Sequence, residues 1–530
     1  MQRSRRTSFL ILAAVILMLV AIGAQPSHAG LWQYSAPLDS VVNSEIHAHA
    51  RAYLWIPPKC RHVRAVVVAQ HNLLEESILL NPKFRRTLES LDMAEVWVMP
   101  SIDFVFDFHK GAGDVFDSMM KTLASASGYS ELAFAPARTL AILSVHGDMP
   151  QSNLTGSGRP NPDWGNSAID GIPGLFVMGQ YEWLDARTQP GLDYVVKHPA
   201  TPLAMLPDIG HGHFDTSDEQ VAFLCLFLRK AVQYRFPSNA PFDAPVALKA
   251  IDPRQGWLVD RWEPERGRKF AAAPYDTYTG DRNGAFWCFD REMAEATENY
   301  GKGRALDLAR SIVYVQDGKV LGGVRGAAGV MPRPKLEMDA DGRTLHFAAY
   351  EVSAAIPPGT EWNDATAAAL HARQLVPKVL CGPIEEIDAA TYRLEFDQSG
   401  FNSAYRSFNV FISTMIPDGE KSMVRSQPAG VFIPHNGAGM ENAIAFPPLP
   451  NVSDRKQIRL SATASSGLPV AYYVDSGPAT IDGDTLKFTP IPPRSKFPVE
   501  VRVVAWQWGR AGAPQVKSAE PVVQTFSITK

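Results

Sequence analysis

The chain has 530 residues, a formal net charge of −4 and 45% hydrophobic residues. This length suggests about two to four domains, and a composition with 20% charged residues excludes a largely disordered chain. Because the charge balance is weakly acidic and no long basic stretch occurs, nucleic acid is excluded as an expected partner.

The first 29 residues are typical of a secretory signal peptide. Arg3, Arg5 and Arg6 precede an unbroken apolar run over residues 9–24, and small residues follow before Gly30. We expect cleavage after Ala29, a secreted or periplasmic location and no transmembrane span in the mature chain, because the run is shorter than the ~20 residues that a span needs. An uncleaved anchor is the alternative.

The next 200 residues alternate apolar runs of strand length with segments of helical spacing. Continuous apolar runs suit strands that are buried on both faces, and their alternation with helices indicates an α/β fold with a doubly wound, mostly parallel sheet. The predicted strands are residues 63–69, 94–99, 139–145, 172–178 and 201–206. The predicted helices are residues 75–91, 114–126 and 216–234, the last opened by a capping box.

Two proline-rich linkers divide the rest of the chain, at residues 237–245 and 443–451. The middle part is expected to be β-rich, and its aromatic-rich start is either a glycan-binding surface or core packing. The expected domains are residues 30–236, 237–445 and 446–530. The last of these resembles a bacterial immunoglobulin-like module in its Ser-Gly-Leu-Pro-Val and Ser-Gly-Pro-Ala motifs, which implies a small β-sandwich that acts as a spacer or adhesive unit.

The four cysteines lie far apart and show no zinc-binding spacing. Cys225 lies within an apolar run and is expected to be a buried free thiol. One disulfide among Cys60, Cys288 and Cys381 stays open, because the sequence does not pair them.

Polar residues follow the last two predicted strands of the α/β region. Glu182 comes just after the strand at 172–178, and His211 and His213 lie among glycines between the strand at 201–206 and the last helix. A histidine in such a loop can take and return a proton. This order of acid and histidine resembles esterase and dienelactone-hydrolase-like members of the α/β-hydrolase superfamily, over about residues 50–235.

The resemblance implies roles for particular residues. His211 is the expected base, preferred to His213, and Glu182 is its expected orienting acid, with Asp185 as the alternative. Asn72 follows the strand at 63–69, where these folds place an oxyanion donor. A structural role for each residue is the competing interpretation, as is a metal pair formed by the two histidines. No carboxylate cluster accompanies that pair, so no metal or other cofactor is expected.

The nucleophile is where the chain departs from the family. No Gly-x-Ser-x-Gly turn occurs, and the helix at 114–126 is followed too closely by the strand at 139–145 to leave room for a strand–elbow–helix unit. Ser144 is the substitute candidate and Ser130 the weaker one. Two hypotheses follow: a carboxylic-ester hydrolase acting on a small or carbohydrate-linked ester, or a catalytically inactive protein that binds glycans or a cell-surface partner.

Overall fold

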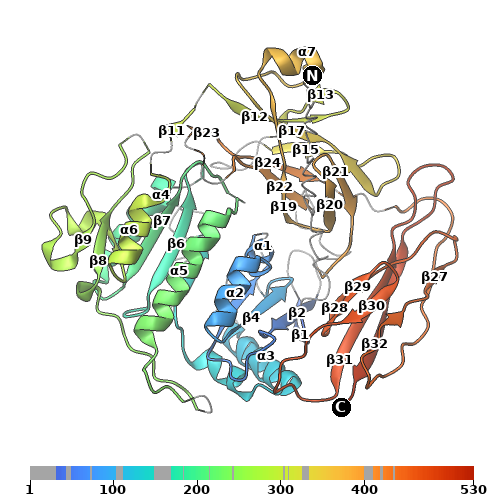
Figure 1. Cartoon of the computed structure of the whole chain (residues 1–530), viewed down its shortest axis with the longest axis horizontal. Coiled ribbons are helices and arrows are strands. Elements are labelled where there is room, and N and C mark those ends of the chain that lie inside the picture. Colours follow the sequence, from blue (N-terminus) through green and yellow to red (C-terminus); the bar gives the residue numbers. More distant parts are fainter. Residues whose placement is uncertain are drawn as a thin grey trace, which may run out of the picture.

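The computed structural model describes most of the chain after residue 31 (Figure 1). The described part is residues 32–530 without 43–48, 72–73, 103–110, 148–168, 183, 214, 242–243, 265, 303–304, 308, 325–332, 399–409, 418–419, 421, 432 and 434–435. The proposed signal peptide and Asn72 therefore lie outside the described residues.

The first sheet is mixed rather than parallel. Its order is β1-β2-β4-β3, and only β3 and β4 run parallel to each other. Its members are β1 (Tyr34–Val42), β2 (His49–Trp55), β3 (Ala65–Gln70) and β4 (Met93–Met99). The apolar run MAEVWVM is buried at every position, which makes β4 the centre of this layer.

The second sheet contains three parallel strands in the order β5-β6-β7. They are β5 (Ile142–Val145), β6 (Gly174–Gly179) and β7 (Leu203–Asp208). Each of the five predicted strands is confirmed, but the expectation of one doubly wound, α/β-hydrolase-like sheet is wrong. The described strands of this region form two separate sheets, because no described strand pairs with both β3 and β5. Elsewhere small, mainly antiparallel sheets prevail.

The helices of this region follow local sequence signals. The predicted helix over 75–91 is two helices, because Pro82 lacks an N–H and the Asn81 side chain accepts from Lys83 N and Phe84 N to begin a new one. The predicted capping box over 216–219 is corrected: Ser217 is the N-cap, its hydroxyl accepts from Gln220 N, and the Gln220 side chain donates to Asp208 instead of completing a box. The helices are α1 (Glu75–Leu79), α2 (Pro82–Ser90), α3 (Ala112–Ser127), η1 (Ser130–Ala137), α4 (Leu184–Lys197) and α5 (Asp218–Arg235).

The aromatic-rich segment packs against α5. Trp287 and Phe289 are almost fully buried, and the Phe289 ring lies 5.7 Å from Phe227 of α5, so core packing accounts for these side chains. The segment comprises η2 (Pro253–Gln255), β8 (Trp257–Asp260), β9 (Ala273–Pro274), η3 (Tyr275–Thr277), η4 (Arg282–Gly284), β10 (Ala285–Cys288) and α6 (Arg291–Asn299).

The middle region is built from short strands, as expected, and lies above the two sheets in Figure 1. Its elements are β11 (Ala305–Leu306), β12 (Ser311–Gln316), β13 (Lys319–Val320), β14 (Gly323–Val324), β15 (Arg333–Leu336), β16 (Thr344–His346), β17 (Ala348–Val352), α7 (Asp364–Ala369), β18 (Arg373–Leu375), β19 (Lys378–Cys381), β20 (Ile384–Asp388), β21 (Thr391–Leu394), β22 (Val410–Thr414), β23 (Ser422–Met423) and β24 (Gln427–Val431).

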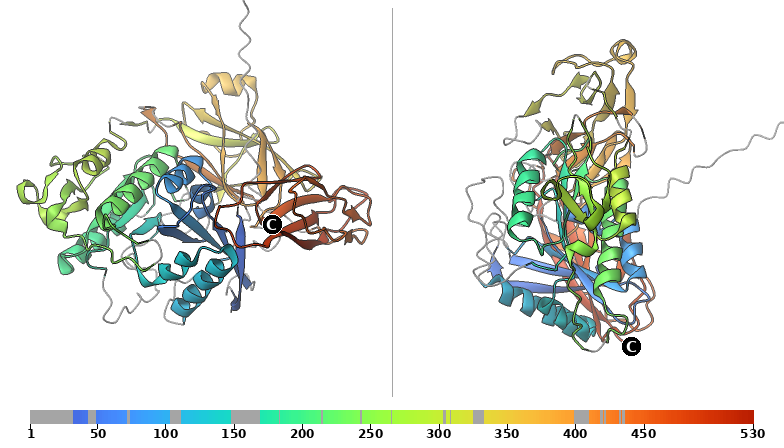
Figure 2. Two further views of the ribbon diagram at one scale, coloured as in Figure 1. Left: turned by 60° about the horizontal axis from the view of Figure 1, so that its bottom comes forward. Right: turned by 90° about the vertical axis from the view of Figure 1, so that its left-hand side faces the viewer.

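The C-terminal region lies against the first sheet and shares a hydrophobic core with it (Figure 2). That core joins side chains such as Leu54 of β2 to Val501 and Phe526. Tyr53 Oη also donates to Asp475 over 2.9 Å. The elements are β25 (Ile444–Ala445), β26 (Ile458–Arg459), β27 (Thr463–Ala464), β28 (Ala471–Ser476), β29 (Ala479–Asp482), β30 (Thr485–Phe488), β31 (Val499–Gln507) and β32 (Ala519–Ile528).

Two further expectations meet the structure here. All four cysteines are buried and free, so none of them forms the disulfide that the sequence left open. Among the described residues, none of the helices combines the length and the apolar character that crossing a membrane requires.

Candidate functional site

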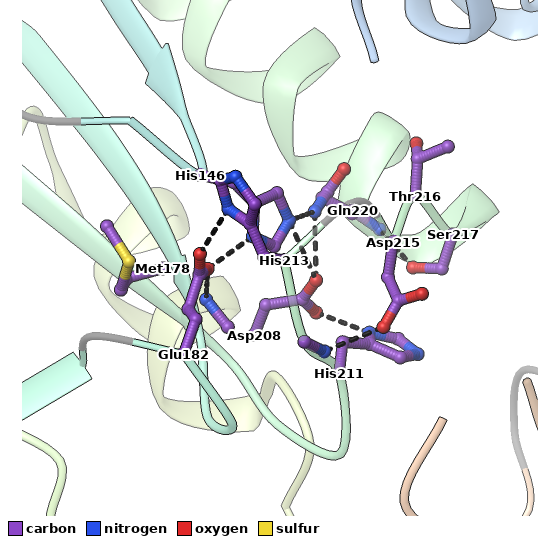
Figure 3. Close-up of polar contacts among 12 residues, drawn as sticks. His146, Met178, Glu182, Asp208, His211, His213, Asp215, Thr216, Ser217 and Gln220 are labelled. Atoms are coloured by element: carbon purple, nitrogen blue, oxygen red, sulfur yellow. Dashed lines mark hydrogen bonds and ion pairs between the residues drawn. The ribbon is translucent and has the colours of Figure 1, made fainter. Parts of the chain in front are cut away.

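Polar side chains gather at the carboxyl ends of β5, β6 and β7 (Figure 3). His146 directly follows β5, Glu182 lies three residues beyond β6, and Asp208 ends β7. The loop after β7 adds His211 and His213. Because parallel strands present their carboxyl ends at one edge of a sheet, residues far apart in the sequence converge there, and ligand sites commonly form at that edge.

The Glu182 carboxylate lies between two imidazoles. One oxygen hydrogen-bonds with His146 Nδ1 and accepts from the Gly179 amide, and the other lies 2.8 Å from His213 Nδ1. The side chains of His146 and Glu182 are 1% and 0% exposed, whereas that of His213 is 19% exposed. The site is therefore buried, and His213 is its side nearest to solvent.

His146 also has an unusual backbone. Its φ of 54° lies in the left-handed region, where non-glycine residues are uncommon and where the conformation costs ~1–3 kcal/mol. The hydrogen bonding between β5 and β6 extends to His146, whose amide donates to Val177 O. The chain then turns at His146 itself. This turn directs the imidazole toward Glu182.

A second set of contacts surrounds this cluster. Gln220 Nε2 donates to Asp208 Oδ2 over 2.8 Å and lies 3.0 Å from His146 Nε2. The other oxygen of Asp208 lies 2.8 Å from His211 Nδ1 and accepts from Tyr300 Oη over 2.5 Å. Asp208 thus links His211 to the cluster formed by His146, Glu182 and His213.

Burial and charge set the protonation of these groups. Burial alone would raise the pKa of Glu182, but His146 and His213 hold that pKa well below its usual range. Burial opposes ionisation of Asp208 too, and His211 with its hydrogen bond outweighs it, so the pKa of Asp208 is lowered. Burial lowers the pKa of His213, which leaves its imidazole neutral at neutral pH. Burial would lower the pKa of His146 too, but the neighbouring Glu182 carboxylate outweighs burial and raises that pKa. The site therefore combines ionised carboxylates with one imidazole whose pKa is raised and one whose pKa is lowered.

The middle region holds the loop that carries the two histidines. Asp215 accepts from the Gly212 amide over 2.6 Å, and it also accepts hydrogen bonds from the hydroxyls of Ser413 on β22 and of Ser426 beside β24. The Ser426 amide donates to Gly210 O over 3.1 Å. The loop is thus anchored between α5 and the β-rich region.

The structure brings together some of the residues expected from the sequence. Glu182 contacts His213, not the preferred base His211. The carboxylate beside His211 is that of Asp208. Asp185 is exposed in the first turn of α4. His146, Asp208 and Gln220 were missed, although His146 and Asp208 both stand at strand ends, which is the signal that could have found them.

The two candidate nucleophiles lie in regular elements of secondary structure. Ser144 lies within β5, opposite Phe176 of β6, in regular strand pairing. Ser130 begins η1. Neither serine therefore occupies a strand-to-helix turn, which is the geometry that exposes a nucleophilic hydroxyl.

The cluster has the donor set of a metal site. His146, Glu182 and His213 each offer one ligand atom, and these atoms lie within 4.8 Å of one another. Two imidazole nitrogens and one carboxylate oxygen are ligands that zinc and iron(II) accept in proteins. The chemistry of the residues therefore fits a divalent transition metal ion.

Comparison with known proteins yields no family. No family model matches the chain, and no curated protein matches it. Solved structures that are similar include EC1-2 of human protocadherin-24, with 13% identity, 37% of this chain, 94% of that chain and a TM-score of 0.15. Tandem Ig repeats of Dlar share 10% identity over 38% of this chain and 96% of that chain, with a TM-score of 0.17.

A third similar structure is a SusE-like surface located polysaccharide binding protein from Bacteroides thetaiotaomicron. It shares 10% identity over 56% of this chain and 48% of that chain, with a TM-score of 0.12. All three scores are far below 0.5, so these similarities carry no argument about function.

Proposed function

We propose that this protein binds a divalent transition metal ion between His146, Glu182 and His213, and that the ion activates water. The observation that carries the proposal is the convergence of three donor atoms within 4.8 Å. Two histidines with one glutamate form a known zinc donor set of the catalytic type, in which a fourth position stays open to water. Zinc is therefore the ion that we expect first.

The charge of the surroundings supports a cation. Glu182, Asp208 and Asp215 are all buried near the two imidazoles, so three carboxylates lie close together in a part of the protein that contains little solvent. A divalent ion at Glu182 would compensate part of this charge. Gln220 and Asp208 face the second nitrogen of His146, where partners of a metal-bound imidazole usually lie and fix its orientation.

The open position gives the site its chemistry. A zinc ion held by these residues would supply Lewis acidity and an activated water at neutral pH, so hydrolysis at such a site would not require a serine hydroxyl. The partly exposed His213 marks the side from which a substrate would approach. The small or carbohydrate-linked ester expected from the sequence suits this chemistry and belongs to the proposal, whereas glycan binding stays a prediction without a site.

Isothermal titration of the metal-free protein with ZnCl2 tests the proposal. We expect one ion per chain, and Glu182→Gln should weaken its affinity by at least about 100-fold, because a neutral amide replaces the ligating carboxylate. Co2+ should give visible absorption bands that the same variant loses. The melting temperature of the variant shows whether it is folded.

The matched control is His346→Asn. His346 is exposed, and its Nδ1 lies 2.5 Å from Asp339, so it forms a histidine–carboxylate pair outside the site. This variant should bind zinc as the parent does. Equal zinc affinity in Glu182→Gln and in the parent protein would refute the proposed site.

A further inference from the structure

The two sheets of the α/β region end in strand edges that face one cavity. β3 is the last strand of the first sheet, and β5 is the last strand of the second. Within the described part of the chain, each pairs with a strand on one side only, β3 with β4 and β5 with β6. In a parallel strand alternate residues direct N–H and C=O to opposite sides, so each outer edge offers backbone donors and acceptors.

These edges are more exposed than the strands beside them. All six residues of β3 and all four of β5 are partly exposed, whereas every residue of β4, β6 and β7 is buried. Yet β3 reads Ala-Val-Val-Val-Ala-Gln, a composition typical of a strand buried on both faces. An apolar strand with an unpaired edge is a template for another strand.

The cavity between the edges has a volume of about 330 Å³. Val66 and Val67 of β3 and Leu143 of β5 line it. It is also lined by Ala240, Pro241, Ala244, Pro245, Val246 and Leu248. The lining is apolar except for Arg64, Glu131, Arg138 and Thr139. Protein interiors are normally close-packed, and a volume of ~300–1,000 Å³ is typical of binding sites.

The charged side chains of the lining are unevenly distributed between the two ends of the cavity. Glu131 is paired with Arg494 over 3.0 Å. Arg64 and Arg138 form no ion pair with another described residue, and Arg64 instead stacks on the Phe236 ring at 4.9 Å. Because Arg64 precedes β3 and Arg138 precedes β5, positive charge is concentrated at the amino ends of both strands.

We propose that this gap binds an extended segment of a partner polypeptide, which adds as a strand parallel to β3 and β5. Its central residues are mainly β-branched, and an acidic residue at its amino end faces Arg64 and Arg138. A fatty acyl chain would fill the apolar volume but leave the outer backbone groups unpaired. A peptide strand supplies backbone donors and acceptors to these edges and side chains to the apolar volume.

The probe is a fluorescein-labelled peptide, Asp-Val-Thr-Val-Ile-Val followed by Lys-Lys for solubility, titrated with the full chain and followed by anisotropy. We expect saturable binding of one peptide per chain. Replacing its Asp with Lys should weaken binding about tenfold, which corresponds to the loss of one favourable charge contact. That difference should become smaller in Arg138→Gln, because Arg64 alone then faces the acidic residue.

Hydrogen exchange locates the peptide. The amides of residues 65–70 and 142–145 should gain protection when it binds. Val67→Lys places a charge in the cavity and should abolish binding, and Ala141→Leu should weaken it by filling space in the same cavity. The matched control is Val42→Lys, because Val42 is 52% exposed on β1, at the opposite edge of the first sheet.

Several results would overturn the proposal. One is the absence of saturable binding by a protein that melts cooperatively, and another is full binding in both cavity variants. Equal affinity for the peptide of reversed sequence would refute the parallel orientation. If dodecanoate protects the same amides and the peptide does not, the cavity takes an acyl chain and the inference is wrong.

Discussion

Two buried titratable side chains of the first sheet respond to pH in opposite directions. Glu95 of β4 is 0% exposed and accepts from Arg85 Nε over 2.7 Å, yet burial raises the pKa of its carboxyl to about 7. His71 follows β3 with its ring 5.7 Å from that of Trp97, and burial lowers the pKa of its imidazole to about 4. Glu95→Gln and His71→Gln separate the two effects.

The magnitudes follow from the shifts. The Glu95 pKa is raised from an ordinary 4.5, so its contribution to stability is complete below pH 4.5 and is lost as pH rises through about 7. The His71 pKa is lowered from 6.5, so stability is present above pH 6.5 and is lost as pH falls through about 4. In both cases the pKa differs by about 2.5 between the folded and unfolded protein, which corresponds to about 3 kcal/mol in the free energy of unfolding.

Urea unfolding followed by tryptophan fluorescence from pH 4.5 to 7.5 checks this reasoning. The free energy of unfolding of Glu95→Gln, relative to the parent protein, should rise by about 3 kcal/mol as pH increases across this range. His71→Gln should show the opposite slope, with its advantage growing toward pH 4. A difference between Glu95→Gln and the parent that stays constant with pH would refute the link between burial and stability.

Two other substitutions test the packing. Asp215→Ala removes a buried acceptor of three hydrogen bonds, so it should lower the free energy of unfolding in urea by about 3 kcal/mol. It should also weaken zinc binding at least about tenfold in the titration. Unchanged stability would contradict the anchoring role of Asp215. Gly256→Ala should cost about 3 kcal/mol in a thermal melt, because its Cβ would lie 2.1 Å from Trp287 Nε1. Gly113→Ala, with nothing within 4 Å, should not destabilise, and equal melting of the two would show that the contact yields.

The individual strands of the α/β region could be predicted because each is a short apolar run bounded by turn residues. The split of the sheets could not, since periodicity does not say which edges pair. Asn81 and Pro82 indicate the break between α1 and α2, but the helical spacing of apolar residues continues across it over 75–91 and predicted one helix. The antiparallel pairing of β1 and β2 beside β4 carried no distinctive signal.

The location of the site residues could be predicted more readily than their hydrogen-bond partners. Strand-end position identified Glu182, His211 and His213, because parallel strands bring their carboxyl ends together. Which acid contacts which histidine depends on loop conformation and rotamers. The left-handed turn at His146, which directs this imidazole to Glu182, has only a weak sequence signal, because histidine adopts this conformation much less often than glycine.

The core that the first sheet shares with the C-terminal strands affects how the chain matures. Leu54 and Val96 are buried in the same cluster as Val501 and Phe526, so the strands of the first sheet complete their packing with residues that are synthesised much later. At ~5–20 residues per second, the interval between them is on the order of a minute. During that time one apolar face of the first sheet is uncovered, and a chaperone that holds this face would raise the yield of native protein.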